Sequence, residues 1–101
     1  PDSHILLDPG IGFGKTVDHN YRLLRDLGIL KQAGFMVLAG ISRKSMIYKP
    51  LGITPGESLP ATAAANLVAL LNGADILRVH DVKEAIQVIK LAEIYERQRS
   101  E

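Results

Sequence analysis

Polar side chains that could bind a charged ligand gather in three short stretches of this sequence. Each stretch directly follows a run of apolar residues, which is typical of a strand buried on both faces. Together the stretches offer a carboxylate, a hydroxyl, several cations and an imidazole, a set that suits an anionic ligand carrying a polar ring. The candidate residues are Asp8, Ser42, Arg43, Lys44, Arg78 and His80.

The first stretch is the glycine-rich run 8–16, which follows the apolar run 5–7. Glycines let the backbone approach a ligand closely, and Asp8 at the end of a strand can orient a polar ligand. The run does not match two common phosphate motifs, because Pro9 and Lys15 stand where those motifs require glycine. It therefore predicts a ligand-binding loop other than a nucleotide phosphate loop. The alternative is that Asp8 only forms a turn.

The other two stretches carry polar residues in pairs spaced two apart. Ser42 and Lys44 form one pair, and Arg78 and His80 form the other. Residues two apart on an extended chain project from the same face, and parallel α/β folds bind ligands at the carboxyl edge of their strands. Each feature has a simpler alternative, namely a solvated cationic loop around Ser42 and a structural ion pair between Arg78 and an aspartate. Their recurrence at equivalent strand ends favours a ligand site.

Apolar strands and amphipathic helices alternate along the chain. This order predicts an α/β protein with a parallel sheet. Asp81 and Glu84 predict a capping box at the start of the last helix. The predicted inner stripe of that helix is Ala85, Ile86, Ile89 and Ala92. The predicted strands are 5–7, 35–41 and 76–80, and the main helices begin near His19 or Asn20, at Ala61 and after Asp81, with Gly34 capping the first.

Composition limits the classes of function. The chain has 101 residues, no cysteine, a net charge of +1 and 47% hydrophobic residues. These values predict one compact unit without disulfides or thiolate metal sites. They give no reason to expect a nucleic acid or a membrane as partner, and we expect a cytoplasmic protein.

Three motifs in the chain resemble, in order, the C-terminal signatures of the dihydropteroate synthase family. They are Asp8–Lys15, Gly40–Ser45 and Arg78–Asp81. The resemblance implies a (β/α)8 TIM barrel, of which residues 1–101 form a C-terminal half-barrel fragment with three βα units. We therefore expect the N-terminal units to be absent from this chain.

The resemblance also implies a reaction, in which 7,8-dihydropterin pyrophosphate condenses with p-aminobenzoate to give dihydropteroate and pyrophosphate. It further implies Mg²⁺, bound through the pyrophosphate and residues outside this chain, a homodimer, and sensitivity of this enzyme class to sulfonamides. The implied roles are pterin binding by Asp8, Gly40 and Lys44, a p-aminobenzoate pocket of Phe13, Ser42, Arg43 and Lys44, and pyrophosphate binding by Arg78, His80 and Ser42.

The length of the chain sets an expectation for its activity. A complete barrel of this kind needs about 250 residues, and three parallel strands leave two unpaired edges. We therefore expect the chain alone to be inactive and to self-associate. Two alternatives stay open at this point: a pterin-dependent (methyltetrahydrofolate) methyltransferase domain, and a non-catalytic half-barrel module that serves only assembly.

Overall fold

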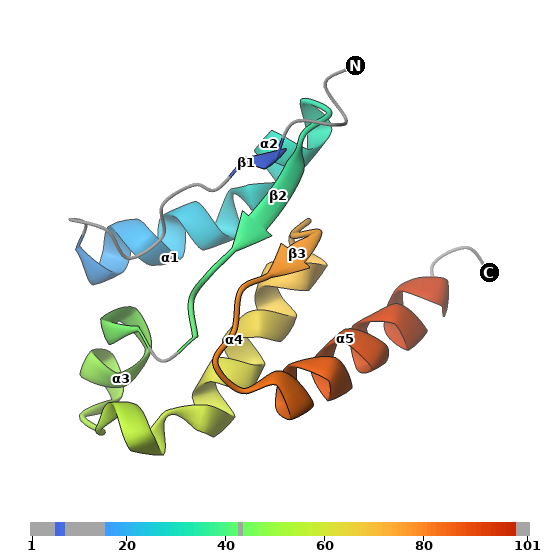
Figure 1. The fold of residues 1–101 in the computed structure, drawn as a ribbon. Coiled ribbons are helices and arrows are strands. Elements are labelled where there is room, and N and C mark those ends of the chain that lie inside the picture. Colours follow the sequence, from blue (N-terminus) through green and yellow to red (C-terminus); the bar gives the residue numbers. More distant parts are fainter. Residues whose placement is uncertain (1–5, 8–15, 43, 99–101) are drawn as a thin grey trace.

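The structure is a computed structural model, and it describes residues 6–7, 16–42 and 44–98. Within these residues, a short parallel sheet has the strand order β1-β2-β3 (Figure 1). The strands are β1 (Leu6–Leu7), β2 (Met36–Ala39) and β3 (Ile76–Leu77). The predicted parallel α/β class is confirmed, although β2 is shorter than the predicted range 35–41 and β3 is shorter than the predicted range 76–80.

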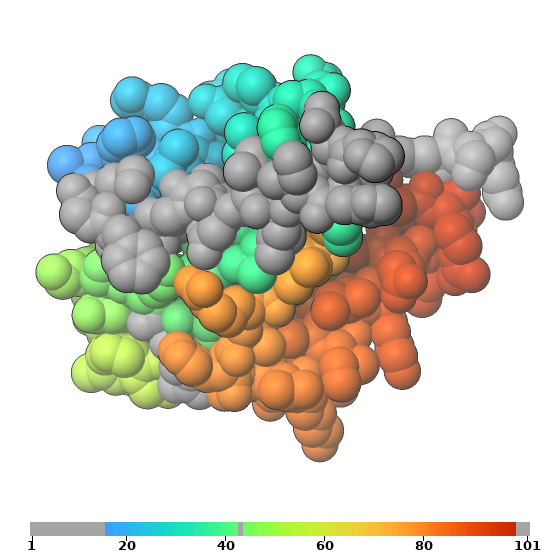
Figure 2. All heavy atoms as spheres, turned by 45° about the horizontal axis from the view of Figure 1, so that its top comes forward, coloured from blue at the N-terminus to red at the C-terminus, as the bar shows by residue number. Residues whose placement is uncertain are grey.

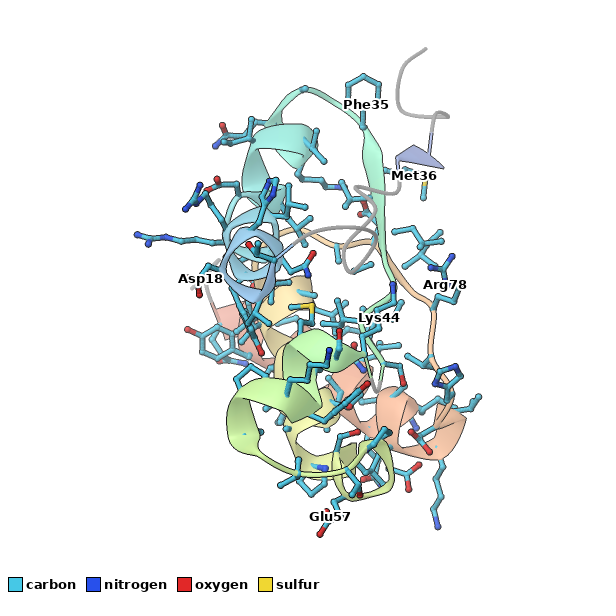
Figure 3. The ribbon with its side chains drawn as sticks, turned by 90° about the vertical axis from the view of Figure 1, so that its left-hand side faces the viewer. Asp18, Phe35, Met36, Lys44, Glu57 and Arg78 are labelled. Carbon is cyan, nitrogen blue, oxygen red and sulfur yellow. The ribbon has the colours of Figure 1, made fainter. Side chains whose placement is uncertain are left out.

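Helices connect the strands and follow the last one. They are α1 (Val17–Arg25), α2 (Leu27–Gln32), α3 (Ser45–Leu51), the short 3-10 helix η2 (Pro55–Glu57), α4 (Leu59–Leu71) and α5 (Val82–Arg97). The helices from α1 to α4 lie to one side of β2 (Figure 3). No helix in the described part of the chain is long and apolar enough to cross a membrane.

The first helical segment differs from the single predicted helix. Helix α1 begins earlier than expected because the Thr16 side chain accepts a hydrogen bond from the His19 N–H at 3.1 Å. A break at Asp26 then divides the segment into α1 and α2. The predicted cap at Gly34 is confirmed: this residue follows α2 with φ +94°, a conformation that glycine adopts without a steric penalty.

The buried core lies between β2 and the helices. Val37 and Ala39 are fully buried on the helix side of β2, and Ile41 continues this line beyond the strand. This alternation places the intervening residues on the opposite face of the strand. The larger core set is Leu24, Leu27, Val37, Ala39, Ile41, Met46, Ile47, Ala65, Ala69 and Ala74.

Helix α5 packs on α4 through small side chains. Ala85 and Ala92 are buried, as predicted, but Ile86 and Ile89 are exposed, so half of the predicted inner stripe is wrong. The two alanines lie seven residues apart on one face of α5, and this helix is in contact with α4. Asp81 is the N-cap but makes no side-chain capping hydrogen bond, so the predicted capping box is also wrong. Atoms of α5, orange to red, form the right-hand side of the face in Figure 2.

Candidate functional site

The candidate site begins where β2 and β3 end. Ala39 pairs with Leu77, and the Arg78 N–H donates to the Ala39 carbonyl at 2.9 Å. The next residue of the β2 segment, Gly40, therefore lies opposite Arg78. The Arg78 guanidinium covers Gly40 so closely that a Cβ added there would stand 2.7 Å from Nη2 and 2.9 Å from Nε.

Beyond Gly40, a side chain continues the connection between the two segments. The His80 N–H donates to the Ser42 Oγ at 3.2 Å, and Ser42 is only 5% exposed. The Ile41 carbonyl, which precedes Ser42, accepts instead from the Lys44 N–H at 3.3 Å in a turn. The serine hydroxyl thus provides the acceptor at a point where the backbone has left the strand.

These segments line a cavity of about 90 Å³. Its lining residues are Gly40, Ser42, Lys44, Arg78, Val79 and His80. The structure therefore brings together all the predicted site residues that lie in its described part. The other three predicted site residues, Asp8, Phe13 and Arg43, lie outside the described residues.

Sequence reasoning missed Val79 as a lining residue. Strict alternation would turn its side chain away from the face that carries Arg78 and His80. Strand β3 ends at Leu77, however, so the segment from Arg78 onward is no longer bound by that alternation. No pattern in the sequence signals where a predicted strand stops pairing.

The chemistry of the cavity suits an anion. Lys44 and Arg78 contribute cations, and Ser42 and His80 contribute polar groups. None of the described residues that line the cavity is a carboxylate. Lys44 and Arg78 lie toward the carboxyl end of β2, whereas Phe35 and Met36 lie at its amino end (Figure 3).

The size of the cavity limits what the described residues can hold by themselves. Pockets for drug-sized ligands enclose roughly 300–1,000 Å³. A cavity of about 90 Å³ has room for a phosphate-sized group but not for a pterin. The described residues also contain no group of three or more side chains that could hold a metal ion.

Helix α3 is fixed behind the site by a contact that the sequence did not reveal. Lys44 is the N-cap of α3, and the Tyr21 hydroxyl of α1 donates to the Met46 carbonyl at 2.8 Å. Partial burial raises the pKa of Tyr21 above its usual value near 10.0, which extends the pH range over which the hydroxyl can donate further into the alkaline region. This bond holds α3 against α1 and so helps to place Lys44.

The amino end of the sheet carries a second polar cluster that sequence reasoning missed. The Asp75 carboxylate accepts from the Val37 N–H at 2.8 Å, and the Asp75 N–H donates to the Val37 carbonyl at 2.8 Å. Lys31 of α2 forms an ion pair with the same carboxylate. These polar groups bind each other, and none of them lines the cavity at the carboxyl end.

The sequence of this chain is similar to known proteins. Residues 1–80 match the family model described as "Pterin binding enzyme". The Escherichia coli (strain K12) dihydropteroate synthase is 45% identical over 88% of this chain and 32% of its own length. A Synechocystis dihydropteroate synthase is 50% identical over 88% of this chain and 31% of its length.

The fold gives a similar result. The structure of Yersinia pestis DHPS with a pterine-sulfa conjugate superimposes with a TM-score of 0.88 and 41% identity, over 92% of this chain and 37% of that chain. The chain therefore spans about a third of the length of the proteins it resembles.

Proposed function

The chain belongs to the pterin binding enzyme family, and from this premise we propose that it supplies part of the active site of a dihydropteroate synthase. Residues 1–101 would be the C-terminal three βα units of a (β/α)8 barrel. The proposal is supported by curated relatives named dihydropteroate synthase, of which the chain spans about a third. We use "complete barrel" below for the protein that contains this chain together with the preceding βα units.

The reaction of such an enzyme would join 7,8-dihydropterin pyrophosphate to p-aminobenzoate. The bond between the pterin methylene carbon and the pyrophosphate oxygen breaks, and the pyrophosphate leaves with the bonding electrons. The amine nitrogen of p-aminobenzoate forms the new bond to that carbon and loses a proton. A neutral aromatic amine needs little activation, so the protein's main tasks are placing the substrates and stabilising the departing anion.

One observation carries the proposal: Lys44, Arg78 and His80 line a single cavity together with the buried Ser42 hydroxyl. Hydrogen bonds from charged donors to phosphate oxygens are among the strongest in proteins. As negative charge builds on the leaving pyrophosphate, Arg78 and His80 donate to it and lower the energy of the transition state. Ser42 and Lys44 border the same space.

The remaining roles place the two ring systems. We assign the pterin to Asp8, Gly40 and Lys44, with the carboxylate stabilising positive charge that develops on the ring. The p-aminobenzoate pocket would be lined by Phe13, Ser42, Arg43 and Lys44. The small volume of the described cavity requires that other parts of the complete barrel enclose the rings.

We also propose that Mg²⁺ accompanies the pyrophosphate. The described lining residues include the cations Lys44 and Arg78, which suit the anion rather than the metal. The ion would be bound by the pyrophosphate and by residues of the complete barrel outside this chain. When bound, it would neutralise part of the pyrophosphate charge.

We propose that the complete barrel forms a homodimer. We also propose that it lies in the cytoplasm. Helix α5 supports self-association because it exposes large apolar side chains, among them Ile86, Leu91 and Tyr95. Sedimentation of the complete barrel at micromolar concentration should give the mass of two chains. A single-chain mass would overturn the dimer and leave the assignment of the reaction intact.

The reaction is tested by incubating the purified complete barrel with 7,8-dihydropterin pyrophosphate, p-aminobenzoate and Mg²⁺. We expect dihydropteroate and pyrophosphate in equal amounts, and no product from the 101-residue chain alone. Equal binding of pyrophosphate-bearing and plain pterins, without product, would instead indicate a pterin-dependent methyltransferase. Unchanged turnover in Asp8→Asn would refute the role of that carboxylate.

A further inference from the structure

We propose that Gly40 and Ser42 are positioning residues: they hold Arg78 and His80 in the places from which these two side chains bind the anion. Gly40, which follows β2, supports Arg78, and Ser42 supports His80. The inference deepens the proposed function, because the anion is taken to be the pyrophosphate.

Gly40 acts by having no side chain. The Arg78 guanidinium occupies the space where a Cβ would stand, with Nη2 at 2.7 Å, Nε at 2.9 Å and Cζ at 3.0 Å from that point. Carbon and nitrogen atoms do not approach this closely without a bond, so any other residue would push the guanidinium aside. Because the guanidinium ends a flexible side chain, it can move without disturbing the fold. A residue without a side chain at position 40 is therefore required for the Arg78 guanidinium to lie where it does.

Ser42 acts through its hydroxyl. A regular parallel ladder that begins with the bond from Arg78 N–H to Ala39 O would continue to the Ile41 carbonyl. That carbonyl is already used by Lys44 in a turn, and the Ser42 Oγ accepts the His80 N–H in its place at 3.2 Å. Ser42 is only 5% exposed, so water has little access to compete for this hydrogen bond. The hydroxyl thus extends the connection between the two segments past the end of the backbone ladder.

The two contacts lie just beyond the last paired residues of the described sheet. Strand β3 has only Ile76 and Leu77, and both Arg78 and His80 are exposed. An arginine side chain loses about 2 kcal/mol of conformational entropy when it is immobilised. A donor that is already held near its working position avoids part of this cost when the anion binds.

The first test is a double-mutant cycle in the complete barrel, with inorganic pyrophosphate as the ligand and calorimetry as the readout. We expect Gly40→Ala to weaken pyrophosphate binding about tenfold when Arg78 is present, and less than about twofold in the Arg78→Ala background. Gly40 is not among the positive-φ glycines, so alanine adds no backbone strain there. An equal loss in both backgrounds would overturn the proposal, because Gly40 would then act on the ligand directly.

Gly28→Ala is the matched control for this cycle. It is also a glycine-to-alanine change, and its Cβ would meet only the Asn72 carbonyl oxygen at an ordinary distance of 3.5 Å. We expect it to leave pyrophosphate binding unchanged in both backgrounds. Binding losses equal to those of Gly40→Ala would show a general effect of the substitution and count against the proposal.

The second test measures hydrogen exchange at the His80 amide in Ser42→Ala and Ser42→Thr. We expect exchange about tenfold faster in the alanine variant and close to wild type in the threonine variant, which keeps the hydroxyl. Unchanged exchange in Ser42→Ala would refute the role of Ser42. Both readouts are independent of turnover, so a complete barrel that forms no dihydropteroate would refute the proposed function and still test the positioning.

Discussion

The two ends of the β2–β3 pair use polar groups in opposite ways. At the amino end, Asp75 binds the Val37 backbone and Lys31, and these groups satisfy one another. At the carboxyl end, Arg78 and His80 face a cavity, and their backbone segment is held by the β2 segment.

This difference separates stability from binding within a few residues of the same strands. Polar groups that bind each other within the protein stabilise the fold. Polar side chains that are held in place beside open space are ready to bind one. The division agrees with the general behaviour of parallel α/β barrels, whose sites lie at the carboxyl ends of the strands.

The largest effect should follow from removing the guanidinium at the carboxyl end. We expect Arg78→Ala in the complete barrel to lower kcat/KM for dihydropteroate formation by about 10²–10³-fold, because the leaving pyrophosphate loses a charged donor. Thermal unfolding should change little, since Arg78 is exposed. Arg78→Lys, which keeps the charge but not the planar fork, should be intermediate. A kcat/KM close to wild type would contradict the role.

A change at the amino end should have the opposite profile. Asp75→Ala leaves the Val37 N–H without its acceptor, and we expect the free energy of unfolding to fall by about 1–3 kcal/mol. Turnover of the folded protein should stay the same. Lys31→Ala is the control for the ion pair alone, and its cost should be about 0–1 kcal/mol because the pair is partly exposed. Loss of turnover without loss of stability in Asp75→Ala would remove the distinction between the two ends.

The contact behind the carboxyl end should show a smaller effect. Tyr21→Phe removes the hydrogen bond to the Met46 carbonyl, and we expect a loss of about 0.5–1.5 kcal/mol in unfolding free energy, measured by denaturant titration. Pyrophosphate affinity should fall only slightly, since α3 retains its packing through buried Met46 and Ile47. A large loss of affinity with unchanged stability would show that Tyr21 serves the site directly.

The smallest effect is expected at η2, in the loop that leads to α4 and away from both ends of the β2–β3 pair. The Glu57 carboxylate accepts hydrogen bonds from the Thr54 backbone N–H and from the Thr54 hydroxyl. These bonds, the backbone one more strongly, hold the pKa of Glu57 below its usual value near 4.5. The folded state therefore binds this proton less readily than the unfolded state. The resulting stability is present above the unfolded pKa and is lost as the pH falls below about 4.5. Glu57→Gln should flatten this acid limb in thermal unfolding series, and an unchanged slope would contradict the assignment.

Sequence reasoning identified the carboxyl end of the sheet but not the amino end. Ser42, Lys44, Arg78 and His80 could be predicted because each follows an apolar run and strand periodicity gathers such residues at one edge. Asp75 carries no comparable signal: its partners on β2 and α2 are about 40 residues away and become neighbours only through the fold.

Errors in the fold prediction had a similar origin. The stripe on α5 was predicted from apolar periodicity, which cannot show that contact with α4 selects Ala85 and Ala92 over the larger Ile86 and Ile89. The single helix predicted before β2 is divided at Asp26, a break that the apolar stripe does not reveal. In both cases, packing between elements decided the outcome.

The central claim is that the carboxyl end alone binds the anion. Calorimetric titration of inorganic pyrophosphate into the complete barrel tests it most directly, with wild type, Asp75→Ala and Arg78→Ala compared at a temperature where all are folded. We predict equal affinities for wild type and Asp75→Ala, and a loss of at least about tenfold for Arg78→Ala. Unchanged affinity in Arg78→Ala, or an equal loss in both variants, would contradict the claim.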